Sequence, residues 1–77
     1  MEQVLFNEQI QVERKTFVFE LRENARGQFL RITEDVGGRR DTVIIPAPGL
    51  QDVCGAIGRA MAAAGPQSLA MEPASVN

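Results

Sequence analysis

Hydrophobic and polar residues alternate with a period of two over most of the first 45 positions. The alternation covers three segments, residues 4–12, 16–22 and 28–34, and a β-branched run follows at 42–45. Successive side chains of a β-strand point to opposite faces, so the alternation predicts three half-buried strands, and the β-branched run favours a fourth. In the first three segments the hydrophobic positions are Val4, Phe6, Ile10, Val12, Phe17, Phe19, Leu21, Leu30 and Ile32.

Turn-forming residues separate these segments. Residues 23–27 include Asn24 and Gly27, which can both adopt positive φ, and a Gly-Gly pair follows at 37–38. The fourth segment ends at Pro46, which has no N–H for a strand ladder. The short spacings predict consecutive strands that are joined by tight turns.

The period then changes from two to that of a helix. Pro48 can begin a helix and Gly65-Pro66 ends it. The helix should carry one apolar stripe, formed by Leu50, Val53, Cys54, Ile57, Met61 and Ala64. Gly55 and Gly58 weaken such a helix by about 0.5–1 kcal/mol each relative to alanine, so it needs a close packing partner. Residues 1–65 are predicted to form one domain, and residues 66–77, which show no period, a disordered tail.

Four strands followed by one helix predict the α+β class, with an antiparallel sheet and the helix on one of its faces. A chain of 77 residues is marginal as a monomer. A single cysteine, Cys54, cannot form an internal disulfide, and without histidine a zinc site is not expected. Of the usual ways to stabilise a small domain, self-association remains. We expect the helix to cross its twin in a homodimer. The interface would be formed by Leu50, Val53, Ile57 and Met61.

Charge is distributed unevenly along the chain, although the net charge is only −2. Residues 14–40 contain seven basic and four acidic residues, and six of the seven bases are arginine. Arginine suits bidentate contact with phosphate and stacking on flat groups. Two interpretations stay open on composition alone: charged strands that simply face water, or a local basic surface that attracts a polyanion.

Phe29 is the informative position in the third strand. If Leu30 and Ile32 face the helix, Phe29 points away from it, beside Arg31. An exposed aromatic ring among arginines and an amide is a common way to hold a single-stranded nucleic acid. The candidate binding residues are Arg22, Asn24, Arg26, Phe29 and Arg31. In the alternative interpretation, Phe29 packs on a second subunit or under a loop.

The sequence offers no constellation for catalysis. It contains no histidine, which removes catalytic triads and most acid–base schemes at neutral pH. We expect neither an enzyme nor a cofactor, a bound metal or a small-molecule substrate. Cys54 lies on the apolar stripe and is expected to be a packed thiol. Without an apolar run of about 18 residues or a signal peptide, a soluble, cytoplasmic protein is expected, and association with the nucleoid is an alternative.

Two segments of the chain resemble the PUR repeat of the purine-rich element binding proteins. The first is Phe-Val-Phe-Glu-Leu-Arg-Glu-Asn-Ala-Arg-Gly-Gln-Phe-Leu-Arg-Ile at residues 17–32, and the second is Thr-Val-Ile-Ile-Pro-Ala-Pro-Gly-Leu at 42–50. The resemblance covers roughly residues 9–61. It implies a Whirly-like fold of four antiparallel strands and one helix, with two repeats intertwined through their helices. A chain with one repeat, similar to bacterial members, would do this as a homodimer.

The same resemblance implies binding of single-stranded DNA and RNA with a preference for purine-rich, G-rich sequences. The five candidate residues named above fall on the family's basic, amide and aromatic positions. Gln28 replaces a usual base, which should weaken phosphate attraction, and Val53 replaces a usual aromatic on the helix. The alternative function is a protein-interaction or structural homodimer that does not bind nucleic acid.

Overall fold

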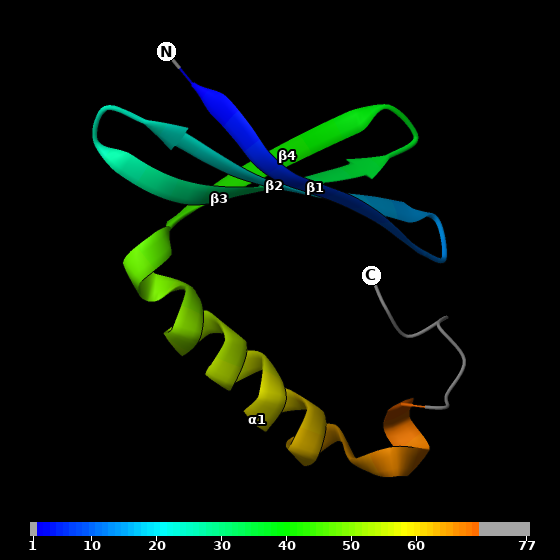
Figure 1. Cartoon of the computed structure of the whole chain (residues 1–77). Helices are drawn as coiled ribbons and strands as arrows, with labels where there is room; N and C mark the ends of the chain where they lie inside the picture. The colour runs from blue at the N-terminus through cyan, green and yellow to red at the C-terminus, as the bar shows by residue number, and fades with distance from the viewer. Residues whose placement is uncertain (1, 70–77) are drawn as a thin grey trace.

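The computed structural model describes residues 2–69 and shows a four-stranded antiparallel sheet followed by one helix (Figure 1). The strands are β1 (Gln3–Val12), β2 (Lys15–Asn24), β3 (Gly27–Val36) and β4 (Arg39–Pro46). A short 3-10 helix, η1 (Ala47–Gly49), leads into α1 (Leu50–Leu69). The predicted α+β class and the order of the elements are confirmed.

The sheet is a simple meander in the order β1-β2-β3-β4. Its three turns have two residues each, so every strand is longer than the hydrophobic pattern predicted. Polar residues at the strand ends still pair along the backbone ladder, which the side-chain pattern does not reveal. Positive φ values occur at these turns, at Glu13 (58°), Gly27 (131°), Gly37 (60°) and Gly38 (93°).

Strand register divides the sheet into two chemically different faces. Leu21 pairs with Leu30 and Phe19 with Ile32, so these hydrophobic residues share one face. The hydrophobic members of this apolar face are Phe6, Ile10, Val12, Phe17, Phe19, Leu21, Leu30, Ile32, Val36, Val43 and Ile45. The opposite, polar face carries Asn7, Gln9, Gln11, Thr16, Val18, Glu20, Arg22, Phe29, Arg31, Thr33, Asp35, Arg40 and Thr42.

A bulge in β1 corrects one part of the predicted pattern. The alternation placed Val4 on the same face as Phe6. In the structure Val4 pairs with Arg22 and Phe6 pairs with Leu21, with Leu5 as the extra residue between them. Because neighbouring positions on β2 face opposite ways, Val4 belongs to the polar face.

The helix begins and breaks close to the predicted positions. Pro48 lies within η1, and α1 starts at Leu50. Gly65, with φ 76° and ψ 163°, interrupts the helical backbone, which then resumes as far as Leu69. Of the expected disordered tail at 66–77, residues 70–77 lie outside the described residues.

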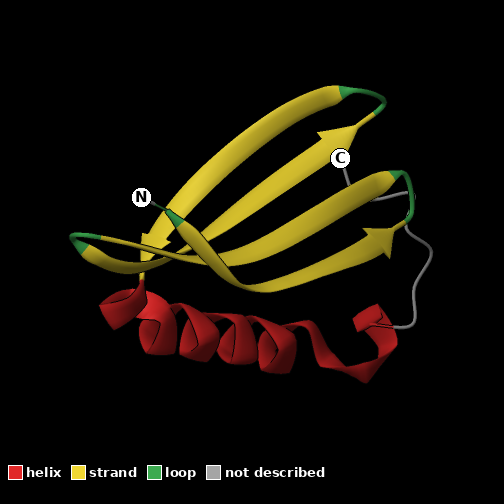
Figure 2. Cartoon of the chain, turned by 45° about the horizontal axis from the view of Figure 1, so that its top comes forward, coloured by secondary structure: helices red, strands yellow, loops and turns green. Residues whose placement is uncertain are grey.

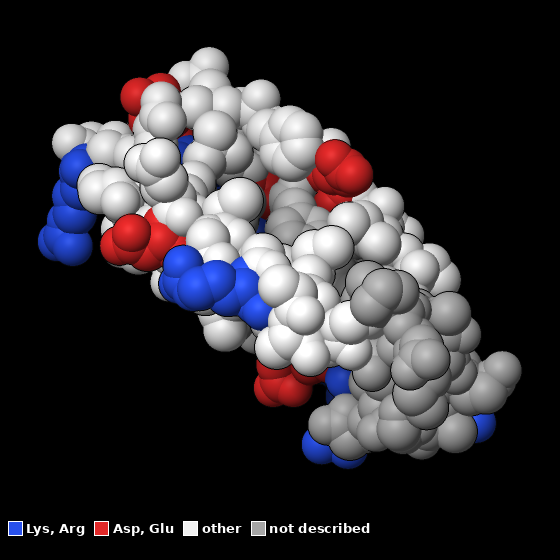
Figure 3. Space-filling view, turned by 90° about the horizontal axis from the view of Figure 1, so that it is seen from below, with Lys and Arg blue, Asp and Glu red and all other residues white. Residues whose placement is uncertain are grey.

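The described chain has no fully buried hydrophobic side chain. The helix lies on one side of the sheet and its axis diverges from it after η1 (Figures 1 and 2). Val43 on the apolar face is 55% exposed, and Ile57 and Met61 on the helix are 58% and 53% exposed. Seen from the helix side, most of the described surface is uncharged (Figure 3). In the described part of the chain, no helix is long and apolar enough to cross a membrane. A single chain therefore leaves both of its hydrophobic surfaces largely uncovered.

Candidate nucleic-acid interface

Phe29 lies on the polar face near the hairpin that joins β2 to β3. It pairs with Arg22 on one side and with Pro46 of β4 on the other, and its side chain is half-buried. Paired residues share a face, so Phe29 is separated from Leu30 and Ile32, which lie on the apolar face. A hollow of about 460 Å³ adjoins the ring, lined by Glu2, Asn24, Arg26, Gly27, Gln28, Phe29, Ile44 and Pro46.

Arg22 is already engaged by two carboxylates of the chain. Its Nη1 lies 2.5 Å from Oε1 of Glu2, and its Nε lies 3.4 Å from Oε1 of Glu20. The hydrogen bond that Arg22 donates to Glu2, with the negative charges of both acids, raises the pKa of Arg22 above its ordinary value, and desolvation opposes this rise. An incoming phosphate would therefore compete with Glu2 for this guanidinium.

The hairpin positions Asn24 and Arg26 through one local contact. The backbone N–H of Arg26 donates a hydrogen bond to Oδ1 of Asn24 at 2.8 Å. This is the side-chain turn that asparagine commonly makes, and it uses one of the two acceptor positions of the amide oxygen. The two N–H donors of the amide and the second lone pair of Oδ1 can contact a ligand.

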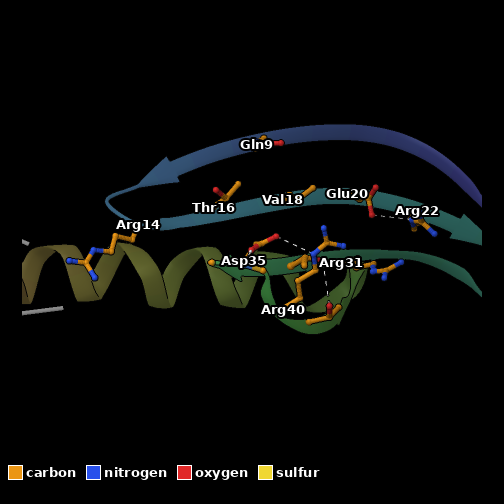
Figure 4. Close-up of a pocket in the computed structure, with 13 residues that line it drawn as sticks. Gln9, Arg14, Thr16, Val18, Glu20, Arg22, Arg31, Asp35 and Arg40 are labelled. Carbon is orange, nitrogen blue, oxygen red and sulfur yellow. Dashed lines mark hydrogen bonds and ion pairs between the residues drawn. The ribbon is translucent and has the colours of Figure 1, made fainter. Parts of the chain in front are cut away.

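A second hollow, of about 650 Å³, extends over the polar face toward the other end of the sheet (Figure 4). It is lined by Gln9, Arg14, Thr16, Val18, Glu20, Arg22, Arg31, Thr33, Asp35, Gly37, Gly38, Arg40 and Thr42. Asp35 accepts hydrogen bonds from the Gly38 N–H at 3.0 Å and from Nε of Arg40 at 3.1 Å. The described residues contain no cluster of three or more side chains that could hold a metal ion.

The predicted site residues divide between these two hollows. Asn24, Arg26 and Phe29 line the hairpin hollow, whereas Arg22 and Arg31 line the larger one. The cross-strand pairing of Arg22 with Phe29 makes the two hollows contiguous. Sequence reasoning did not select three charged residues of the polar face. Glu20 has the parity of Arg22 on β2, Asp35 has the parity of Arg31 on β3, and Arg40 of β4 pairs with Asp35. Arg14, in the β1-β2 turn, carried no comparable signal.

Comparison with known proteins identifies a family for this chain. The family described as PurA ssDNA and RNA-binding protein matches residues 1–74. The chain belongs to the PurA family. Transcription factor Pur-alpha 1 of Arabidopsis thaliana is 44% identical to it over 46 residues, which is 60% of this chain. The chain spans 16% of the length of that relative.

In this PurA-family chain, the predicted interface residues lie along the α1 stripe. Leu50 and Val53 are half-buried near the start of the helix, and Ile57 and Met61 are exposed. Cys54, expected to be a packed thiol, is exposed in the single chain. The physical reason is that nothing else in the described chain covers this part of the stripe.

Proposed function

We propose that this chain binds single-stranded DNA or RNA through the polar face of its sheet, with a preference for purine-rich, G-rich strands. The observation that carries the proposal is the placement of Phe29 beside Arg22, with Arg31 on the same face. Membership of the PurA family supports the class of ligand. We assign the chain no catalytic step and no cofactor.

In the proposed mechanism, one base stacks on Phe29 while arginines neutralise the neighbouring phosphates. A stacked base contributes about 1–3 kcal/mol. Arg26 is exposed at the hairpin and Arg31 is half-buried on the polar face, and the described chain forms no ion pair with either guanidinium. The amide nitrogen of Asn24 would donate to an acceptor on a base edge, while its oxygen accepts the hydrogen bond that holds the turn.

The binding unit in this proposal is a homodimer. The apolar face and the helix stripe are both exposed in one chain, and a second copy presents complementary surfaces of the same kind. A symmetric pairing in which each α1 packs against its twin would cover Leu50, Val53, Ile57 and Met61. Such an interface also explains how a helix that contains Gly55 and Gly58 is held. The two polar faces would remain open to the nucleic acid.

A direct binding measurement tests this function. The chain is titrated with fluorescent GGN-repeat DNA and RNA and with a pyrimidine strand of the same length, at several salt concentrations. We expect tighter binding of the GGN strands and weaker binding as salt rises, because phosphate contacts release counterions. Weak binding that is equal for all strands and independent of salt would favour a protein-interaction dimer instead. A cytoplasmic location, which fractionation of the source cells can check, fits this proposal.

A further inference from the structure

Glu20 is an acidic residue in the middle of a face to which we assign phosphate binding. It pairs with Arg31 of β3 on one side and with Asn7 of β1 on the other. Its side chain is 20% exposed and lines the larger hollow, beside Arg22 (Figure 4). A carboxylate at this position repels phosphates. It would instead attract a hydrogen-bond donor of a ligand.

The carboxylate of Glu20 is held loosely by its own chain. Oε2 accepts one hydrogen bond from Nδ2 of Asn7 at 3.4 Å. Oε1 lies 3.4 Å from Nε of Arg22, but this buried nitrogen has no hydrogen-bond partner. Asp35, the other carboxylate of the larger hollow, has contacts of 3.0 and 3.1 Å. Since an ionised carboxylate has about four acceptor positions, Glu20 retains capacity for a ligand.

Strand geometry places Glu20 next to the proposed stacking ring. Arg31 is its direct partner across the β2-β3 pair, so Phe29, two residues before Arg31, is its diagonal neighbour. Diagonal neighbours in an antiparallel pair are roughly 7–8 Å apart. A base stacked on Phe29 extends over such a distance, and one of its edges can meet the carboxylate.

The common bases of DNA and RNA differ in what they offer to a carboxylate. On its Watson–Crick edge, guanine presents two adjacent donors, the N1–H and the N2 amino group. Adenine and cytosine present one amino group beside a ring-nitrogen acceptor, which repels the second oxygen. Uracil and thymine present one N–H between two carbonyl acceptors. Single strands expose this edge to a protein, so an acceptor-only side chain there selects guanine.

We propose that Glu20 is a specificity-determining residue that binds the N1–H and N2 amino group of a guanine stacked on Phe29. The inference rests on the proposed single-strand binding and adds the residue that chooses the base. A different role has to be distinguished from it: Glu20 could act only on Arg22, as a charge that positions the guanidinium. That role affects the affinity for every strand by the same factor.

Base analogues separate these two roles. Binding of a GGN-repeat strand is compared with a strand that carries inosine, which lacks the N2 amino group, and with one that carries 7-deazaguanine, which lacks N7. Each is measured as DNA and as RNA with the wild-type chain, with Glu20→Gln and with Asp35→Asn. Asp35→Asn removes the same charge from the same face. Thermal unfolding of each variant is recorded alongside.

We expect inosine to weaken wild-type binding by about tenfold, the lower end for a hydrogen bond to a charged group. The 7-deazaguanine strand should bind like the parent strand. Glu20→Gln should bring the guanine-to-inosine ratio close to one, because an amide offers one acceptor and one donor, whereas Asp35→Asn should keep the wild-type ratio. A ratio near one for the wild type, or one unchanged by Glu20→Gln, overturns the role of Glu20 and leaves single-strand binding standing. Failure of every strand to bind the folded wild type overturns the proposed function itself.

Discussion

Arg22 of β2 and Phe29 of β3 are direct cross-strand partners on the polar face of the sheet. The pairing sets a guanidinium beside the half-buried ring of Phe29, close to the β2-β3 hairpin. Phe17 and Phe19 project from the apolar face instead. One residue type therefore has two environments in this chain, and the predictions below exploit the difference.

Phe29→Ala should weaken single-strand binding by about 1–3 kcal/mol, the contribution of one stacked base. The thermal midpoint should change little, since the ring packs only partly against the sheet. Phe19→Ala, the matched control, should destabilise the fold by about 3–5 kcal/mol, because it leaves a cavity in the core that forms once the homodimer covers the apolar face. Titration and thermal melts of both variants check this. If Phe29→Ala unfolds the protein while binding per folded molecule survives, Phe29 is a core residue and the stacking mechanism is wrong.

Glu2→Gln should increase the affinity for single strands. The substitution removes the carboxylate that occupies Nη1 of Arg22, so a phosphate no longer has to displace it. Glu8→Gln is the control, because it removes the same charge from β1 at a position paired with Phe19, on the apolar face. An equal increase in both variants would show a general effect of net charge, and the competition at Arg22 would be refuted.

The salt dependence of binding should report the same competition. With Arg26 and Arg31 as the two uncompensated contacts, the slope of log K against log salt should be about −1.4 for a strand on one repeat. In Glu2→Gln, Arg22 becomes a third contact and the slope should steepen to about −2. Titrations between 50 and 200 mM salt, roughly the range over which such slopes are resolved, measure the difference. Identical slopes in the wild type and in Glu2→Gln would show that Arg22 does not contact phosphate.

Light scattering should give twice the 8.4 kDa mass of the chain at a protein concentration on the order of tens of micromolar. Ile57→Asp should lower this mass and unfold the protein together, because folding and assembly are linked when the core forms between two copies. Ala62→Asp is the control on the opposite side of α1, about 140° away. A stable 8.4 kDa wild-type monomer would contradict the homodimer.

The sequence predicted the strands and the helix because each one has its own local pattern of hydrophobic residues. Alternation within residues 4–34, the β-branched run at 42–45 and the helical spacing after Pro48 predicted all four strands and the helix in the right order. The strand ends were predicted too short, since backbone pairing continues through polar residues. The bulge at Leu5 was missed for another reason: a register shift depends on the partner strand and leaves no mark in one segment alone.

The candidate site could be predicted only from the alternation of odd and even positions along each strand. Parity separated Phe29 from Leu30, and the register agrees with that separation. The pairing of Arg22 with Glu2, 20 residues earlier, is a contact between distant segments and could not be read from spacing. The same holds for Glu20, whose surroundings come from three different strands.

The bulge in β1 also decides which charge the polar face carries beside Arg22. With regular pairing, Leu5 would oppose Arg22 and Gln3 would turn to the polar face. The extra residue at Leu5 turns Glu2 there instead. β1 is an edge strand, so a slip by one residue leaves the pairing of the other three strands intact. Two registers of one strand would thus present an acid or a neutral amide to the same guanidinium. If the proposed interface binds nucleic acid, strand alignment would change its affinity without altering any residue that touches the ligand.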